Sequence, residues 1–238
     1  MEYGQDVFGI RTNFKGSKIL NEKATDDRMT DLDYNSDRTI DTIGDATNEA
    51  KGQSFDLNMQ SEWYKAGATK VSFLGGYRYD EYDFVAYDPR TLFWDEAIDT
   101  SQYPLLYDGV GITYNTKYSM PYIGGVMKYE KGKFELGLTA KYSPIASVED
   151  EDDHKMRYKL NTSEADGSMV IASLKANYNI NDSWSLFLEG QTTKSDTMEG
   201  TQNQYWYDGE WKGWEYEDIN YTNEVNLTQI DLGVKDNF

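Results

Sequence analysis

The stretch "KFELGLTAKYSPIA", residues 133–146, decides the fold that the sequence predicts. From Phe134 to Tyr142 its even-numbered residues are apolar and its odd-numbered residues are polar or glycine. Successive side chains of a β-strand point to opposite faces, so this alternation is typical of a strand with one apolar and one polar face. The pattern recurs in "FDLNMQSEW" (55–63) and "IDLGVKDNF" (230–238), and we therefore expect many such strands.

The segments between the predicted strands are of two kinds. Short turns such as "YEKGKF" (129–134) alternate with long polar segments at residues 15–52, 87–113, 146–166 and 194–222. Short turns at one end of the strands and long loops at the other are typical of outer-membrane barrels. Aromatic residues near the predicted strand ends fit the interfacial girdles of such a barrel; they are Tyr77, Tyr79, Tyr82, Tyr118, Tyr122, Tyr142 and Trp184.

The predicted fold is therefore all-β. We expect a single domain over residues 1–238, an antiparallel transmembrane β-barrel of about eight strands with long acidic extracellular loops. The last residue, Phe238, lies on the apolar face of its strand and favours this membrane barrel. A soluble antiparallel sandwich or barrel remains the alternative, because both classes share the period-two alternation.

The composition limits the classes of function. A formal net charge of −19 argues against nucleic-acid binding and favours cationic partners or a divalent cation. The absence of cysteine excludes disulfides and thiolate zinc sites. The 20 tyrosines and 6 tryptophans argue against disorder, because disordered acidic chains are poor in aromatic residues.

Two pairs of polar residues carry the spacing of catalytic groups. The only histidine, His154, follows five consecutive acids, and Asp152 lies two residues before it. In an extended chain these two side chains share a face, so the carboxylate can orient the ring and make it a general base for water. Asp31 and Asp33 form a second pair of this spacing, able to hold a water or share a proton. Both pairs fall in predicted long loops, and we expect them at one rim.

A calcium loop is the rival interpretation of the second pair. Its oxygen ligands would have the spacing of positions 1, 3, 5 and 7 of such a loop; they are Asp31, Asp33, Asn35 and Asp37. Ser36 in place of glycine and Thr42 in place of glutamate argue against it. The corresponding interpretation of the acids before His154 is a solvated charge run.

As a set, the landmarks of the chain resemble the omptins, the outer-membrane proteases of Gram-negative bacteria. The landmarks occur in order from about residue 29 to residue 238; they are "MTDLDY", "SFDLNM", "GGYRYDEYDF", "YSMPYIGG", "KFELGLTAKYS", "EDDH", "LFLEGQ" and "LGVKDNF". The resemblance implies an aspartic-type endopeptidase that uses no covalent intermediate. His154 would deprotonate a water and Asp152 would orient and stabilise His154. Asp31 and Asp33 would position that water and the reacting carbonyl.

The resemblance also implies partners and a location. Omptins cleave next to basic residues, and Asp150 and Asp45 match acids that bind the substrate in this family. Cationic peptides or proteins are the expected substrates of a monomer in the outer membrane, with the active site facing outside. No metal or cofactor is expected, and lipopolysaccharide is the expected activator. Lys117 matches one basic lipid-binding position, whereas Tyr79, Glu81 and Glu164 depart from the family pattern.

Omptins are ten-stranded, and the resemblance begins near their third strand. We therefore expect the N-terminal hairpin to be missing from this chain. Three classes of function follow: an omptin-like endopeptidase, a non-catalytic outer-membrane barrel with adhesin-like or ligand-binding loops, and a soluble calcium- or carbohydrate-binding β domain.

Overall fold

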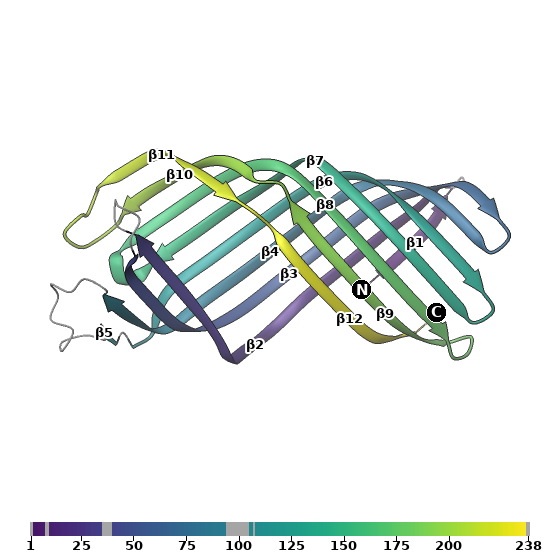
Figure 1. The fold of residues 1–238 in the computed structure, drawn as a ribbon, viewed down its shortest axis with the longest axis horizontal. Coiled ribbons are helices and arrows are strands. Elements are labelled where there is room, and N and C mark those ends of the chain that lie inside the picture. The colour runs from purple at the N-terminus through teal and green to yellow at the C-terminus, as the bar shows by residue number, and fades with distance from the viewer. Residues whose placement is uncertain (1, 8–9, 35–39, 94–104, 107, 237–238) are drawn as a thin grey trace.

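The computed structural model describes residues 2–7, 10–34, 40–93, 105–106 and 108–236. These residues are almost entirely antiparallel strands (Figure 1). The described residues include one short 3₁₀ turn, η2 (Lys155–Arg157). In the part of the chain that the structure describes, no helix is long and apolar enough to cross a membrane.

The strands form one sheet in which chain neighbours pair. They are β1 (Glu2–Val7), β2 (Ile10–Tyr34), β3 (Ile40–Ala66), β4 (Thr69–Phe93), β5 (Leu105–Leu106), β6 (Val110–Lys131), β7 (Phe134–His154), β8 (Lys159–Asn179), β9 (Trp184–Ser195), β10 (Met198–Trp206), β11 (Glu215–Asn223) and β12 (Asn226–Asp236). β9 and β10 both pair with β8 and continue one line, as do β11 and β12 beside them. The long lines confirm the predicted barrel of about eight strands.

Backbone pairing does not close this sheet within the described residues. β1 lies at one edge, and the line of β11 and β12 lies at the other. The sheet nevertheless curls around an interior, because the guanidinium of Arg78 on β4 donates to Gln191 Oε1 on β9, at 3.4 Å. Three strands separate β4 from β9 in the sheet, so this contact crosses the lumen.

The two ends of the barrel differ. Residues 67–68, 132–133 and 180–183 make short turns at one end, on the right in Figure 1. Strands β2, β4, β7 and β10 end at the opposite end, which we call the loop end. The segments 15–52 and 146–166, predicted as long loops, are largely strand here, because the backbone pairing of β2 with β3 and of β7 with β8 continues toward the loop end.

An apolar belt covers the outer face toward the short turns. Its large side chains are exposed on β3, β4, β6, β7, β8, β9 and β12; they include Leu57, Phe73, Ile123, Leu136, Leu138, Leu174, Leu188, Ile230 and Leu232. A continuous band of this kind is the lipid-facing surface of a transmembrane barrel. Tyr77, Tyr142 and Trp184 are exposed on it, as the predicted girdle requires. The prediction was wrong for Tyr122, which is buried inside and bonded to Asp56, and for Tyr118, which packs against the buried inner residues.

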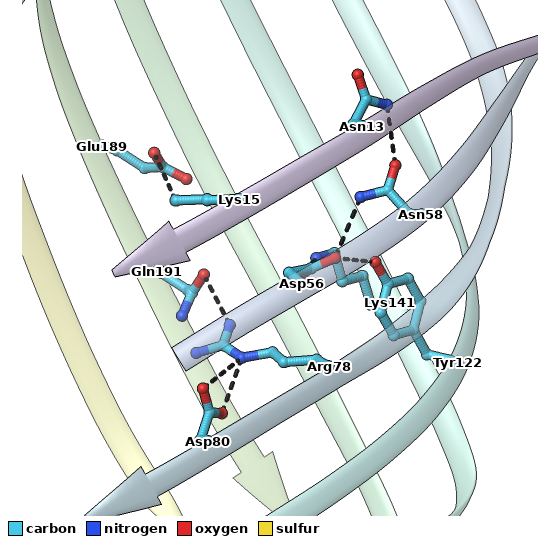
Figure 2. A network of polar contacts seen from close by, with 10 residues as sticks. All are labelled: Asn13, Lys15, Asp56, Asn58, Arg78, Asp80, Tyr122, Lys141, Glu189 and Gln191. Atoms are coloured by element: carbon cyan, nitrogen blue, oxygen red, sulfur yellow. Dashed lines mark hydrogen bonds and ion pairs between the residues drawn. The ribbon is translucent and has the colours of Figure 1, made fainter. Parts of the chain in front are cut away.

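Polar side chains fill the lumen behind this belt (Figure 2). The Asp56 carboxylate accepts hydrogen bonds from the Tyr122 hydroxyl, the Lys141 ammonium group and Asn58 Nδ2. Asn13 on β2 donates to Asn58 at 2.9 Å. Buried charges of this kind are tolerated when they are paired and hydrogen-bonded.

A second set of contacts ties distant strands together across the lumen (Figure 2). Arg78 forms an ion pair with Asp80 at 2.8 Å while it reaches Gln191. Lys15 on β2 lies 3.6 Å from Glu189 on β9. The contact between Lys15 and Glu189 connects strands that lie near the two edges of the sheet.

An apolar layer lies above the polar network, toward the loop end. Its members are buried on the inner faces of β6, β7, β8 and β10; they include Met120, Val148, Ala165, Met169, Ile171 and Met198. Val148 is the inward neighbour of Asp150 along β7, so this layer forms the floor beneath the candidate site.

Candidate active site

A β-bulge in β7 decides which way the candidate residues point. Between Ser143 and Ala146, β7 advances three residues while β8 advances two, from Met169 back to Gly167. Ser143 and Ala146 are 0% exposed, whereas Ile145 between them is 67% exposed. The extra residue therefore reverses the face of every side chain that follows it.

The reversal brings the acidic stretch into the barrel. Below the bulge the even-numbered residues, such as Leu136 and Leu138, face outward. Above it the even-numbered side chains of Asp150, Asp152 and His154 turn to the inner side. Without the bulge they would share the lipid-facing side of the strand. The pattern analysis missed this change of face, and Pro144 was its signal, because proline in a strand marks an edge or a bulge.

Deletion of Ile145 tests the role of the bulge. The shortened strand places Asp152 eight positions after Ser143, an even number, so unbroken alternation should keep both on the inner face and Glu151 on the outer face. The chain has no cysteine, so Glu151→Cys gives a unique label site in both backgrounds. A bulky, water-soluble maleimide should react with Cys at this position at the same rate in both backgrounds. A clearly faster reaction in the deletion variant would show that the parent strand alternates without a bulge and holds this position inside.

The expected contact between Asp152 and His154 is present. His154 Nε2 lies 2.8 Å from Asp152 Oδ2, and both side chains are mostly buried. Asn161 on β8 donates to the same oxygen at 3.2 Å. The carboxylate is thereby fixed from two sides, and it orients the ring. The pair can take a proton from a water and keep the resulting imidazolium stable.

Asp150 lies deeper in the same interior. Its side chain is 7% exposed, and the hydroxyl of Tyr221 on β11 donates to Oδ2. Burial and the Asp150 carboxylate both raise the pKa of Tyr221, and the same two causes raise that of Tyr114 on β6. Both phenols therefore keep their protons at neutral pH, and Tyr221 remains a donor to Asp150.

Several buried oxygen atoms around Asp150 have no hydrogen-bond partner within the described part of the chain. They are Asp150 Oδ1, Asn161 Oδ1, Asn223 Oδ1 and Thr116 Oγ1. Buried acceptors without donors are costly, so each such atom calls for an explanation. A guest rich in N–H groups, such as a guanidinium or ammonium group, would satisfy them.

The other predicted acids lie on β2 and β3 at the same end. Asp31 pairs through its backbone with Gly44, Asp33 with Thr42, and Asp45 with Thr30. The ends of β2 and β7 both belong to the loop end, so the two predicted catalytic pairs share one rim. The side chains of these three acids lie outside the described residues. The calcium hypothesis also needs residues 35–37, which lie outside them.

The predicted lipid position, Lys117, lies on the outer face of β6. Its backbone neighbours across the sheet are Glu81 on β4 and Glu149 on β7, and Glu164 faces Glu149 from β8. A single lysine therefore stands in a row of carboxylates. The described residues contain no group of three or more His, Cys, Asp or Glu that could hold a metal ion.

Comparisons with known proteins identify one family. The model of the Omptin family matches residues 9–230. The chain is 29% identical to a plasminogen activator of Yersinia pestis over 65% of this chain and 49% of that protein. It is 26% identical to Protease 7 of Escherichia coli O157:H7, over 63% of this chain and 49% of that protein. The chain thus spans about half the length of these curated relatives.

The fold also matches a solved structure. The crystal structure of the outer membrane protease OmpT from Escherichia coli superposes with a TM-score of 0.77 at 20% identity. The match covers 96% of this chain and 79% of that one. At this level of identity the likeness concerns the fold.

Proposed function

The chain belongs to the omptin family, and from this premise we propose that it is an outer-membrane endopeptidase that cleaves next to basic residues. The observation that carries the proposal is the inward-facing pair of Asp152 and His154, which the bulge turns into the barrel. On the outer face of the barrel this pair would lie away from the lumen. Inside the rim it can act on a peptide that enters from the loop end.

The proposed reaction uses a water as the nucleophile. The His154 imidazole removes a proton from the water as its oxygen attacks the peptide carbonyl carbon. Asp152 stabilises the imidazolium that forms, at the 2.8 Å contact already present. Asp31 and Asp33 would hold the water and the reacting carbonyl from the other side of the rim. The imidazolium then gives its proton to the leaving amine as the carbon–nitrogen bond breaks.

Asp150 is the proposed binding residue for a basic side chain, with Asp45 as a further acid. The acceptor atoms without donors around Asp150 suit a guanidinium, which carries five N–H donors and accepts none. A net charge of −19 would also attract cationic peptides before they bind.

Replacement of Asp150 by asparagine should weaken this preference. We expect kcat/KM for a peptide with arginine at the cleavage point to fall about 10- to 100-fold, the size of one charge-assisted hydrogen bond. The matched control is Glu151→Gln, which removes the same charge from the outer face of the next residue. Cleavage assays of both variants, on arginine and on neutral peptides, make the comparison. Equal losses in the two variants would contradict the assignment.

The proposed location follows from the belt and the two ends. The belt lies in the outer membrane, the loop end faces outside, and the barrel acts as a monomer. Lys117 is the proposed contact with outer-membrane lipid, and lipopolysaccharide the proposed activator. No metal is required.

The direct test is cleavage by the refolded chain. The protein would be folded in detergent with lipopolysaccharide and given a fluorogenic peptide with an Arg-Arg core, with and without EDTA. We expect cleavage between the arginines that EDTA leaves unchanged. A folded barrel that cleaves nothing would favour the non-catalytic, adhesin-like alternative.

A further inference from the structure

The hairpin between β10 and β11 gathers aromatic and acidic side chains at the loop end. Residues 205–218, "YWYDGEWKGWEYED", hold six aromatic residues and five acids against one lysine. We call this segment the aromatic hairpin. The catalytic pair and the floor described above use none of its residues, and the lipid-facing belt lies at the other end of the barrel.

The aromatic hairpin is an ordered structure. The backbone N–H of Trp206 donates to Trp214 O at 3.0 Å, and that of Gly213 donates to Trp206 O at 2.8 Å. Gly213 has a φ of 84°, a conformation that glycine adopts readily, and it makes this tight closure possible. The rings of Trp211 and Trp214 meet edge to face with centroids 4.6 Å apart. Both side chains remain about half exposed.

The aromatic hairpin is fastened to the connection that follows the catalytic pair. The Tyr207 hydroxyl donates to Asp153 Oδ1 at 2.9 Å, and Asp153 lies between Asp152 and His154. The Tyr207 N–H donates to Tyr158 O at 2.9 Å. Burial and the bond to Asp153 raise the pKa of Tyr207 to about 12, so this hydroxyl keeps its proton. The exposed tryptophans therefore stand at a fixed position beside the mouth of the candidate site.

Two lysine side chains of the protein itself already contact the aromatic and acidic side chains of this hairpin. Lys159 Nζ lies 5.7 Å from the centroid of the Trp206 ring. Lys212 Nζ lies 3.6 Å from Asp208 Oδ1. These are the two contacts that a guest lysine or arginine would make, one with a ring face and one with a carboxylate. The pair of exposed tryptophans and the surrounding acids offer the same chemistry to a guest.

We propose that the aromatic hairpin is a docking site for a basic segment of the peptide substrate, outside the residues next to the cleaved bond. This inference rests on the proposed endopeptidase function. Lysine and arginine side chains of the substrate contact the rings of Trp211 and Trp214. The acidic side chains of the hairpin attract the positive charges of these side chains. The five acids favour a cationic peptide over a neutral sugar, because a sugar carries no positive charge for them to attract.

The test separates binding from hydrolysis. His154→Ala protein, folded in detergent, is titrated with a fluorescently labelled peptide that has an Arg-Arg core and a tail of four lysines. The Trp211→Ala/Trp214→Ala double replacement in the same background should raise the Kd about 5- to 30-fold, the value of two exposed cation–π contacts. The same peptide with a Gly-Ser tail should bind more weakly, and the double replacement should change its Kd far less.

A matched pair of tryptophans provides the control. Trp63 and Trp184 are also exposed but belong to the opposite end of the barrel. Trp63→Ala/Trp184→Ala should leave the Kd of the lysine-tailed peptide unchanged. Glu210→Gln/Glu217→Gln, which keeps every ring, should raise that Kd and reduce its salt dependence.

Each outcome bears on one of the two proposals. Tail-dependent binding that needs Trp211 and Trp214 supports the docking site even if the His154-containing protein cleaves nothing, in which case the proposed hydrolysis fails alone. The docking site is overturned if the Arg-Arg core is cleaved but the Kd is equal for both tails. It is also overturned if the Trp211→Ala/Trp214→Ala variant binds the lysine-tailed peptide with an unchanged Kd. Binding of a neutral oligosaccharide in preference to the lysine-tailed peptide also overturns it.

Discussion

Replacement of His154 by alanine should lower kcat for peptide hydrolysis about 10²- to 10⁴-fold, the usual contribution of a positioned general base. The ring is the only imidazole in the chain, so no neighbouring histidine can take over its role. KM should change much less, because in the proposed mechanism His154 acts on the water and Asp150 binds the basic side chain. Steady-state assays with the Arg-Arg peptide measure both constants.

Asp152→Asn gives the companion measurement for the pair. The amide keeps the shape of the side chain but removes the charge that stabilises the imidazolium, so a substantial loss in kcat is expected here too. Circular dichroism in detergent should show the same strand content for both variants as for the parent. Retention of more than about a tenth of the parent rate by a folded His154→Ala protein would be incompatible with general-base catalysis by this residue.

Replacement of Asp56 by alanine should lower the free energy of unfolding by about 3–5 kcal/mol, as expected when one partner of a buried ion pair is removed. The carboxylate accepts from Lys141, Tyr122 and Asn58 inside the lumen. Without it the Lys141 ammonium group, which is mostly buried, loses its anionic partner. Urea unfolding in detergent micelles, followed by tryptophan fluorescence, measures the change.

The double replacement Asp56→Ala/Lys141→Met provides the diagnostic control. It removes both charges and should recover much of the stability, because the cost comes from the unpaired ammonium and not from the missing carboxylate. Asp182→Ala, in an exposed short turn, should cost well under about 1 kcal/mol. If the double variant is no more stable than Asp56→Ala alone, the ion pair is not what holds this part of the lumen.

The period-two pattern was sufficient to predict the strands below the bulge. Leu136 and Leu138 alternate strictly because one face meets lipid and the other meets the polar lumen. Above the belt the outer face of a strand is polar and the inner face mixes polar side chains with the apolar floor, so this constraint disappears. Residues 15–52 therefore resembled a loop in the sequence, although most of them pair as β2 and β3.

The candidate site could be predicted only in part. The spacing of Asp152 and His154 predicted their contact, since residues i and i+2 of a strand share a face whatever that face is. Which face they occupy depends on the extra residue near Pro144, and alternation alone cannot locate it. The girdle prediction for Tyr122 failed for a related reason. A tyrosine side chain fits a membrane girdle and a hydrogen bond to Asp56 in the lumen equally well. Tyr221 and Asn161 carried no local signal, because β8 and β11 bring them to the site from distant parts of the sequence.

The length of β7 beyond the apolar belt sets the distance between the catalytic pair and the membrane surface. His154 lies about nine residues past Ile145, the last exposed apolar residue of the strand, which at about 3.3 Å per residue and a tilt of about 40° is roughly 20 Å. The Debye length at physiological salt is only about 8 Å, so the negative charge of the lipid surface is largely screened at that height. The electric field that a cationic substrate meets at the rim is therefore the protein's own. Substrate capture should depend on the acids of the loop end and remain insensitive to the charge of the surrounding lipid.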